Sequence, residues 1–305
     1  MENSYDVIVL GGGAAGLTAG IYLSRAKVKT LILNEGMVGG QMVLTYEIAN
    51  YPGIELTSGY QLSMTMKKQA ESFGCDIKQN INISEVDLSG EIKKVVVGEK
   101  TYTSKAIIIA SGGRSRNLGV QGEGTFKGRG ISYCATCDGD FYTGQDIIVV
   151  GGGNSALEEA VSLTKYAKSV TIIHQFDHFQ AFEHAIEVAK ANEKISFIMK
   201  SSIDGFYGDE KVKYVNIKNL ETEEVYKKEI DGVFIFIGYA ANSDKFKDQV
   251  AINNYGEIIS DNNMSTNTKG VFVAGDVREK KIRQITTAVS DGAIAAVNTI
   301  EYIQK

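Results

Sequence analysis

The chain has 305 residues, of which 43% are hydrophobic and 23% charged, an ordinary composition for a globular protein of about two domains. Its net charge of -5 excludes the basic surface typical of nucleic-acid-binding proteins. The sequence shows neither a signal-peptide pattern nor an apolar run long enough for a transmembrane helix, and it contains only 3 cysteines. We therefore expect a cytoplasmic protein that binds neither nucleic acid nor a membrane.

A glycine-rich turn follows the first predicted strand, residues 5–10, and opens a predicted helix that reaches Arg25. Strand, Gly-x-Gly-x-x-Gly and helix in this order are typical of a dinucleotide-binding turn. Gly11 permits the tight turn, Gly13 lets a pyrophosphate approach the backbone, and Gly16 allows the helix to pack closely on the strand. The N–H groups at the start of the helix are expected to face the anion. The motif is Gly11-Gly12-Gly13-Ala14-Ala15-Gly16.

Polar residues that could contact the rest of a nucleotide come next along the chain. A second strand, residues 29–33, ends near Glu35, whose carboxylate is placed to bind ribose hydroxyls. A glycine-rich turn beside a solvated Glu would look the same. Two further loops, Gly39-Gly40-Gln41 and Asn50-Tyr51-Pro52-Gly53, combine glycines with polar side chains that suit a flat, hydrogen-bonding ring, although a loop without a ligand would be similar. A helix over 57–73, strands within 76–103 and a buried strand over 105–110 complete this part.

A pair of cysteines lies between this turn and a second one, within Cys134-Ala135-Thr136-Cys137-Asp138-Gly139. A Cys-x-x-Cys pair can store two electrons as a disulfide because two intervening residues let the sulfurs meet. Zinc would need about four ligands, and neither Cys75 nor any of the 3 histidines has ligand spacing with the pair, so no metal is expected. A structural disulfide and inert buried thiols are the remaining alternatives.

A second strand–glycine–helix unit begins at residue 146 and contains Gly151-Gly152-Gly153-Asn154-Ser155-Ala156. Its next strand, 170–174, ends where such folds read the ribose or 2′-phosphate of a second nucleotide. The segment there, His174-Gln175-Phe176-Asp177-His178-Phe179-Gln180, contains neither Arg nor Lys. Guanidinium groups normally bind a 2′-phosphate, and Asp177 would repel it. The alternative is that basic groups arrive from elsewhere in the fold.

The last third of the chain returns to buried strands. Residues 232–238 are expected to close the second domain, and residues 269–275 form a strand that delivers Asp276 to a turn. A long Ala-rich helix follows, whose N-terminus can face an anion. It begins at Arg283-Gln284-Ile285-Thr286-Thr287-Ala288. A solvated turn residue is the alternative interpretation of Asp276.

Together these motifs resemble the low-molecular-weight, bacterial-type thioredoxin reductases nearly from end to end, and Cys-Ala-Thr-Cys-Asp-Gly is the most specific of them. The resemblance implies an α/β fold of two Rossmann-like, three-layer ββα dinucleotide-binding domains, the second inserted into the first. The FAD domain would comprise 1–112 and 243–305, and the insert that carries the dithiol would comprise 115–240. Family members are homodimers and alternate the dithiol between flavin and thioredoxin by a domain rotation.

The resemblance also implies roles for single residues. Cys137 would exchange electrons with the flavin, Cys134 would attack the disulfide of thioredoxin, and Asp138 would hold and release protons. Asp276 would bind the ribityl and phosphate region of FAD. The other cofactor-binding residues implied are Gly11, Gly13, Ala14, Ala15, Gly16, Glu35, Gly40, Gln41, Asn50, Arg283, Gln284, Ile285 and Ala288.

The chain departs from the family in one segment. NADPH-dependent members carry His-Arg-Arg-x-x-x-Arg where this chain has His174 to Gln180 without an arginine. Each lost charge-assisted contact is worth about 1.5–3 kcal/mol. A subfamily that takes electrons from reduced ferredoxin also lacks these arginines, so we expect a ferredoxin-dependent flavin thioredoxin reductase. NADPH- or NADH-dependent thioredoxin reductase is the main alternative. A ferredoxin–NADP reductase would lack the dithiol, and an inactive flavin scaffold is a further alternative.

Overall fold

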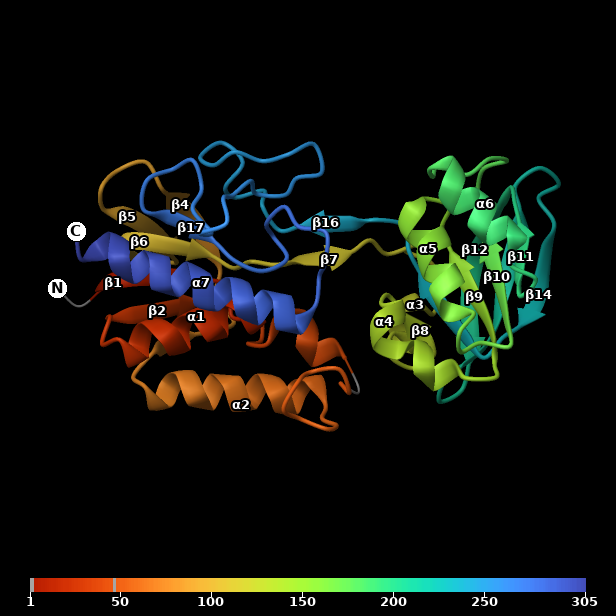
Figure 1. Cartoon of the computed structure of the whole chain (residues 1–305), viewed down its shortest axis with the longest axis horizontal. Coiled ribbons are helices and arrows are strands. Elements are labelled where there is room, and N and C mark those ends of the chain that lie inside the picture. The colour runs from red at the N-terminus through yellow and green to blue at the C-terminus, as the bar shows by residue number, and fades with distance from the viewer. Residues whose placement is uncertain (1–2, 46–47) are drawn as a thin grey trace. The chain divides into compact units, whose positions relative to one another are not determined.

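The structure is a computed structural model that describes residues 3–45 and 48–305 of the chain. It divides into two compact units. Unit 1 comprises Met1–Arg114 and Ala240–Lys305, and unit 2 comprises Ser115–Tyr239. The chain passes between the units twice, through β7 (Gly113–Ser115) and β16 (Tyr239–Ala241), which pair as a two-stranded sheet (Figure 1). Unit 2 is therefore one continuous segment between the two parts of unit 1.

Unit 1 is built on a mixed seven-stranded sheet in the order β3-β2-β1-β6-β5-β4, with β17 also paired to β6. Strands β1, β2, β3, β6 and β17 are parallel, and β4 and β5 run antiparallel to their neighbours. The strands are β1 (Ser4–Leu10), β2 (Thr30–Leu33), β3 (Asp76–Lys78), β4 (Ile83–Asp87), β5 (Lys93–Val97), β6 (Lys100–Ile109) and β17 (Val271–Val273). The helices are α1 (Ala14–Arg25), α2 (Gly59–Ser72), α7 (Ile285–Ile303) and the 3-10 helix η1 (Gly40–Leu44).

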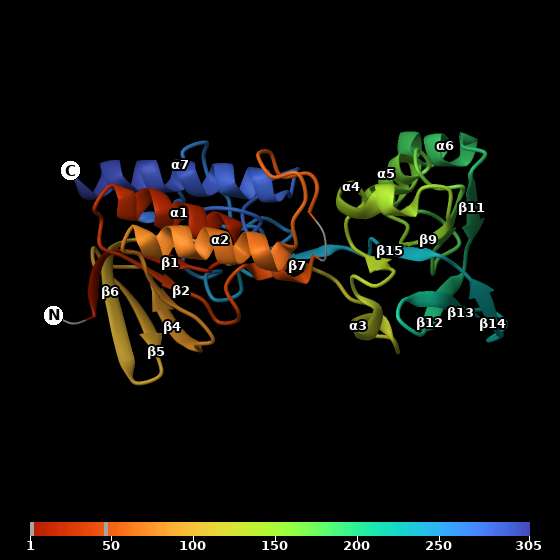
Figure 2. The same cartoon turned by 90° about the horizontal axis from the view of Figure 1, so that it is seen from below.

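Alternating side chains of β1 bury both faces of this sheet, as the period of two in a strand requires. Val7 and Val9 lie in a core with residues of α1, α2 and α7. Ile8 and Leu10 lie in a second core with residues of β4, β5 and the segment 246–277. Figure 2 shows α1, α2 and α7 along one side of the sheet.

Unit 2 repeats this plan with a five-stranded parallel sheet in the order β11-β10-β9-β15-β8. A three-stranded antiparallel sheet, β12-β13-β14, accompanies it. The strands are β8 (Ile131–Ser132), β9 (Asp146–Val150), β10 (Ser169–Ile173), β11 (Ile195–Ile198), β12 (Ser201–Gly208), β13 (Val212–Asn219), β14 (Val225–Glu229) and β15 (Gly232–Ile235). The helices are α3 (Glu123–Phe126), α4 (Ala135–Asp138), α5 (Asn154–Leu163), α6 (Glu183–Ala191) and the 3-10 helix η2 (Gly139–Tyr142).

The same alternation separates the two cores of unit 2. Ile147 and Val149 of β9 pack with α5 and β10, whereas Ile148 and Val150 pack with β12 and β13. Each unit thus combines parallel strands, which pack against helices, with antiparallel strands, which confirms the predicted α/β class with two Rossmann-like units. Among the described residues, no helix has both the length and the apolar character needed to cross a membrane.

Candidate functional site

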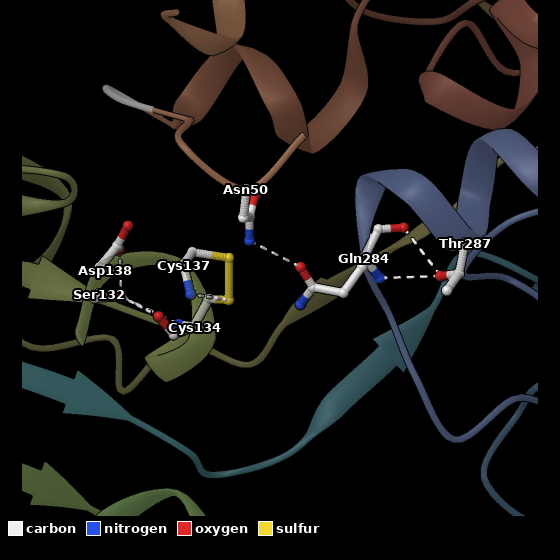
Figure 3. Close-up of a disulfide and its surroundings, with 7 residues drawn as sticks. All are labelled: Asn50, Ser132, Cys134, Cys137, Asp138, Gln284 and Thr287. Carbon is white, nitrogen blue, oxygen red and sulfur yellow. Dashed lines mark hydrogen bonds between the residues drawn. A yellow bond between two sulfur atoms is a disulfide. The ribbon is translucent and has the colours of Figure 1, made fainter. Parts of the chain in front are cut away.

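Cys134 and Cys137 of unit 2 are joined by a disulfide, with their Cα atoms 5.3 Å apart (Figure 3). Cys134 precedes the short helix α4, and Cys137 lies within it. The backbone N–H of Cys137 donates to Sγ of Cys134 over 3.2 Å. Both cysteines are half-buried, and Thr136 between them is exposed. The helical turn therefore places both sulfurs together at a half-buried position.

Asp138 ends α4 directly after the second cysteine, and its carboxylate is fixed by Ser132 from the end of β8. The Ser132 hydroxyl donates to Oδ2 of Asp138 over 2.5 Å (Figure 3). Burial raises the pKa of Asp138 above its ordinary value, the Ser132 hydrogen bond opposes this, and Asp140 adds to it. A carboxyl group whose pKa lies closer to neutrality can take up and release protons beside the disulfide.

Metal binding is not supported by the described part of the chain, which contains no group of three His, Cys, Asp or Glu side chains arranged to hold an ion. The third cysteine, Cys75, is buried in unit 1. Burial raises the pKa of its thiol to about 12, so it is almost entirely protonated at neutral pH and a poor nucleophile.

The first glycine turn has the backbone geometry of a dinucleotide site. Gly11 has a φ of +113°, and a side chain there would collide with the carbonyl oxygen of Ala110, 2.2 Å from its Cβ position. Gly16 brings α1 onto the turn, because its Cβ position lies 1.9 Å from the Gly11 carbonyl oxygen. A Cβ at Gly13 would meet no described heavy atom within 4 Å. The start of α1, which includes Ala14 and Ala15, therefore has open space over Gly13.

Two neighbouring loops hold this turn in place. Asn34, the residue after β2, accepts a hydrogen bond from the Gly12 N–H over 2.8 Å. Gly39 donates its N–H to the Gly12 carbonyl over 2.7 Å. The next residue, Gly40, packs so closely that its Cβ position lies 3.3 Å from Cα of Gly13. Gln41 follows in η1 with an exposed side chain.

The turn that carries Asp276 packs on the same part of unit 1. Gly275 faces α1 and α7, with its Cβ position 2.8 Å from Cβ of Ala15 and 3.8 Å from Cβ of Ala288. Burial raises the pKa of Asp276 to about 6, while Lys280 opposes this and Asp291 adds to it. The predicted residues Ala15, Asp276 and Ala288 are therefore brought next to the first glycine turn.

Asp291 of α7 holds the turn that carries Asp276 through hydrogen bonds. Its carboxylate accepts from the Gly275 N–H over 3.1 Å and from Nζ of Lys280 over 2.7 Å. Nζ of Lys280 also lies 3.9 Å from Oδ1 of Asp276. Both Lys280 and Asp291 are buried, so this pairing is shielded from solvent.

The N-terminus of α7 is joined to the loop that carries Asn50. Nδ2 of Asn50 donates to Oε1 of Gln284 over 3.3 Å, and Gln284 forms a capping box with Thr287 (Figure 3). Arg283 forms an ion pair with Glu257. Ile285 begins the helix and packs on the core around α1. The start of α7 is therefore held by Asn50 and Glu257 from two other segments and by its own capping box.

Glu35 lies at the carboxyl end of β2, as expected, but its carboxylate has protein partners. Oε1 accepts from Nζ of Lys245 over 2.6 Å and from the Ile83 N–H over 3.2 Å. The side chain is still 47% exposed, so it can meet solvent or a ligand while these bonds hold it.

The first glycine of the second turn has a backbone conformation like that of Gly11. Gly151 has a φ of +139°, and its Cβ position lies 2.3 Å from the carbonyl oxygen of Phe236. The face of Gly152 is covered by His174, whose ring atoms lie 2.4 Å from the Cβ position of that glycine. The His174 ring stacks on Phe179, with centroids 5.9 Å apart. Gln180 then crosses the turn and donates its N–H to the Gly152 carbonyl over 2.8 Å.

The segment after His174 carries Asp177 at the place where a Rossmann-like fold would bind the 2′-phosphate of NADPH. Asp177 is 65% exposed and pairs with His178 over 2.7 Å. Lys200 acts on Asp177 electrostatically, but its Nζ lies 2.7 Å from Oε1 of Glu221. This lysine is thus a basic group from elsewhere in the fold, as the alternative interpretation required, and it already has a carboxylate partner.

Four side chains with local roles are missing from the sequence prediction. Asn34 could have been found, because it is a polar residue directly after a strand and adjacent to Glu35. Ser132, Lys280 and Asp291 lie in no motif, and only the folded chain brings them to the residues that they hold.

Comparison with known proteins finds relatives over almost the whole chain. A sequence profile described as "Pyridine nucleotide-disulphide oxidoreductase" matches residues 5–292. The chain is 45% identical to the thioredoxin reductase of Peptoclostridium acidaminophilum, with 100% of this chain and 98% of that protein covered. It is 44% identical to the "34.2 kDa protein in rubredoxin operon" of Clostridium pasteurianum, with 99% and 98% covered.

Solved structures agree with the sequence relatives. The thioredoxin reductase of Streptococcus pyogenes MGAS5005 aligns with a TM-score of 0.96 at 40% identity and covers 100% of this chain and 99% of its own. The thioredoxin reductase of Giardia duodenalis aligns with a TM-score of 0.93 at 33% identity and covers 99% and 100%.

Proposed function

We propose that this chain, which belongs to the pyridine nucleotide-disulphide oxidoreductase family and within it to the low-molecular-weight, bacterial-type thioredoxin reductases, takes its electrons from reduced ferredoxin. Its activity is the reduction of the thioredoxin disulfide, and its cofactor is FAD, which the enzymes of this family bind. The Cys134–Cys137 disulfide beside Asp138 is the observation that supports the thioredoxin reductase chemistry.

FAD supplies the redox step, since a flavin accepts electrons singly or in pairs. The residues of unit 1 fit such a dinucleotide. Gly13 leaves room for a pyrophosphate over the start of α1, whose N–H groups favour an anion. We assign Asp276 to the ribityl and phosphate region, Glu35 to the ribose, and the α7 start to the flavin ring. Gly40, Gln41 and Asn50 would complete the site.

The two cysteines divide the thiol chemistry. We assign Cys137 to electron exchange with the flavin and Cys134 to thioredoxin. The Cys134 thiolate attacks one sulfur of the thioredoxin disulfide and forms a mixed disulfide, and the Cys137 thiolate then attacks the Cys134 sulfur and releases reduced thioredoxin. The Cys137 N–H donates to Sγ of Cys134, which would stabilise a thiolate at the attacking sulfur. Asp138 would hold the proton that the thiols gain and lose.

The ferredoxin assignment rests on the segment after β10. It offers Asp177 rather than guanidinium groups to a 2′-phosphate, and Lys200 is paired with Glu221. A ferredoxin delivers one electron at a time, so two reduced ferredoxins would serve each thioredoxin disulfide. NADH is the second candidate donor, because it lacks the 2′-phosphate and the second glycine turn is retained. We further expect a cytoplasmic homodimer.

Anaerobic mixing tests the donor. The oxidised enzyme is mixed separately with reduced ferredoxin, NADPH and NADH, and flavin bleaching and thioredoxin thiols are both followed. We expect bleaching and thiol formation with ferredoxin and neither with the nucleotides. Rapid bleaching by NADPH or NADH would overturn the ferredoxin assignment without affecting the thioredoxin assignment.

Cysteine variants in the same assay test the two thiol roles. In Cys137→Ser the flavin should bleach without transfer to Cys134, and in Cys134→Ser it should bleach without delivery to thioredoxin. Cys75→Ser is the matched control, because the Cys75 thiol is buried away from any solvent-exposed site and should leave turnover unchanged. Normal turnover by either active-site variant would contradict the assignment.

A further inference from the structure

We propose that Ser132 is a positioning residue of the dithiol site, whose hydroxyl keeps Asp138 aligned with the disulfide in both of its protonation states. This inference rests on the proposed function, because it deepens the role given to Asp138. Ser132 is buried at the end of β8, six residues before Asp138. No sequence motif points to it, and only the fold places its side chain against α4 (Figure 3).

The Ser132 hydroxyl lies among three polar groups of the dithiol segment. It lies 2.5 Å from Oδ2 of Asp138 and 3.3 Å from the carbonyl oxygen of Cys134. Its oxygen also accepts the N–H of Cys134 over 3.1 Å. The Ser132 side chain therefore contacts both the Asp138 carboxylate and the backbone of Cys134, the cysteine that we expect to attack thioredoxin.

A hydroxyl carries one hydrogen, so it can donate to only one of its two acceptors at a time. When Asp138 is ionised, the charge-assisted bond to Oδ2 is the stronger one and takes the hydrogen. When Asp138 is protonated, the carboxylic acid can donate to the Ser132 oxygen, and the serine hydrogen turns to the Cys134 carbonyl. The carboxyl group thus keeps a partner, and the same position, in both states.

This alternation matches the proton balance of the dithiol. Two electrons break the Cys134–Cys137 bond and leave two sulfurs that need protons or a counter-charge. Asp138 gives its proton to one sulfur, which becomes a thiol, and the other sulfur stays a thiolate. Asp138 is then a carboxylate, and the Ser132 hydrogen turns toward it. When the thioredoxin disulfide reoxidises the dithiol, the proton of the enzyme thiol returns to Asp138, and the two protons that the thioredoxin thiols take up come from solvent.

The other titratable groups around Asp138 do not take over the role of the Ser132 hydrogen bond. Asp140 and Tyr142 of η2 act on Asp138 or respond to it electrostatically. The acidic residues of α5, which packs on α4, are Glu158 and Glu159. These groups are acidic or, for Tyr142, neutral at pH 7, so none stabilises the carboxylate. The Ser132 bond is the contribution that lowers the pKa of Asp138.

Thiol alkylation tests this inference without ferredoxin or a nucleotide. The FAD-bound enzyme is reduced with dithiothreitol, the dithiothreitol is removed anaerobically, and the rates at which iodoacetamide modifies Cys134 and Cys137 are measured by mass spectrometry as a function of pH. An inflection caused by Asp138 is identified as the one that Asp138→Asn removes. Ser132→Ala should move that inflection upward by about one pH unit, because the carboxylate loses a hydrogen bond. Ser132→Thr keeps a hydroxyl and should return it toward the wild-type position.

Two controls keep the result interpretable. Thr136→Ala removes an exposed hydroxyl between the same cysteines and should leave the inflection in place. Retained FAD and an unchanged flavin spectrum show that each variant is folded. An inflection that stays in place in Ser132→Ala, or one that is absent from the wild type, would overturn the inference. Because the assay needs neither ferredoxin nor thioredoxin, failure of the donor assignment would leave this readout intact.

Discussion

Polar residues with no motif of their own hold the motif residues in position. Asn34 fixes Gly12, Ser132 fixes Asp138, and Asp291 fixes the turn before Asp276. In each case a side chain satisfies a backbone N–H or a carboxylate that would otherwise lose its hydrogen bonds to water on burial. The electrostatic cost that remains is visible in the raised pKa values of Asp138 and Asp276.

Asp276 gives a prediction about stability. Burial raises its pKa to about 6, so the folded protein binds this proton more tightly than the unfolded chain. The protonated Asp276 side chain therefore stabilises the folded state at low pH, and this stabilisation is lost as pH rises between about 4 and about 6. Asp276→Asn should stabilise the FAD-free protein at neutral pH by roughly 1–2 kcal/mol and have little effect near pH 4. Thermal unfolding at the two pH values measures this.

The same substitution should lower the amount of FAD that the purified protein retains, because an amide oxygen accepts a weaker hydrogen bond from a ribityl hydroxyl than a carboxylate does. Asp248→Asn is the control, since Asp248 is an exposed acid of unit 1 and should change neither property. If Asp276→Asn were less stable than wild type in the FAD-free form at neutral pH, the burial of Asp276 would not be the source of its shifted pKa.

At the scale of elements, the two glycine turns have the same strand–turn–helix arrangement and differ in the last residue of the motif. In α1, Gly16 sits against the Gly11 carbonyl. In α5 the corresponding residue is Ala156, which is fully buried. At this position the first helix therefore approaches its turn more closely than the second helix does.

Exchange of these two residues tests how much the closer approach matters. Gly16→Ala places a Cβ 1.9 Å from the Gly11 carbonyl oxygen, so α1 must move, at a cost of about 3 kcal/mol. Loss of FAD and a lower unfolding temperature are expected. Ala156→Gly relieves no clash and should cost only about 1 kcal/mol through helix propensity, with FAD retained. A Gly16→Ala variant that keeps FAD and wild-type stability would contradict this account.

For the molecule as a whole, the net negative charge lies entirely in unit 2. Unit 2 contains 13 Lys and Arg residues against 18 Asp and Glu, whereas unit 1 contains 19 of each. A unit with this balance repels the phosphates of a nucleotide. The missing arginines after β10 thus remove both a specific contact and part of the compensating positive charge.

Restoring the arginines tests this explanation. The triple variant Gln175→Arg, Phe176→Arg and Gln180→Arg should increase the rate of flavin bleaching by NADPH at least about tenfold, because each charge-assisted contact is worth about 1.5–3 kcal/mol. Stopped-flow absorbance measures the rate. The triple alanine variant at the same positions is the control, since it removes the same side chains without adding charge. Equal bleaching in the two triple variants would show that the phosphate contacts do not decide the donor.

The sequence by itself determined the α/β class, the two strand–glycine–helix units and the Cys134–Cys137 pair. These features depend on local rules: hydrophobic periodicity sets each strand and helix, and fixed spacing sets each turn and the dithiol. The departure after β10 was also visible in the sequence, because it is a matter of which residue types are present.

Only the tertiary structure decided which distant side chains meet. Asn50 and Gln284 are 234 residues apart and hydrogen-bonded, Glu35 pairs with Lys245, and Gly152 lies under His174. No periodicity or spacing encodes such contacts. They arise because burial of both faces of each sheet fixes the strand order and the helix positions cooperatively, and the polar side chains carried by those elements then pair with whatever lies beside them.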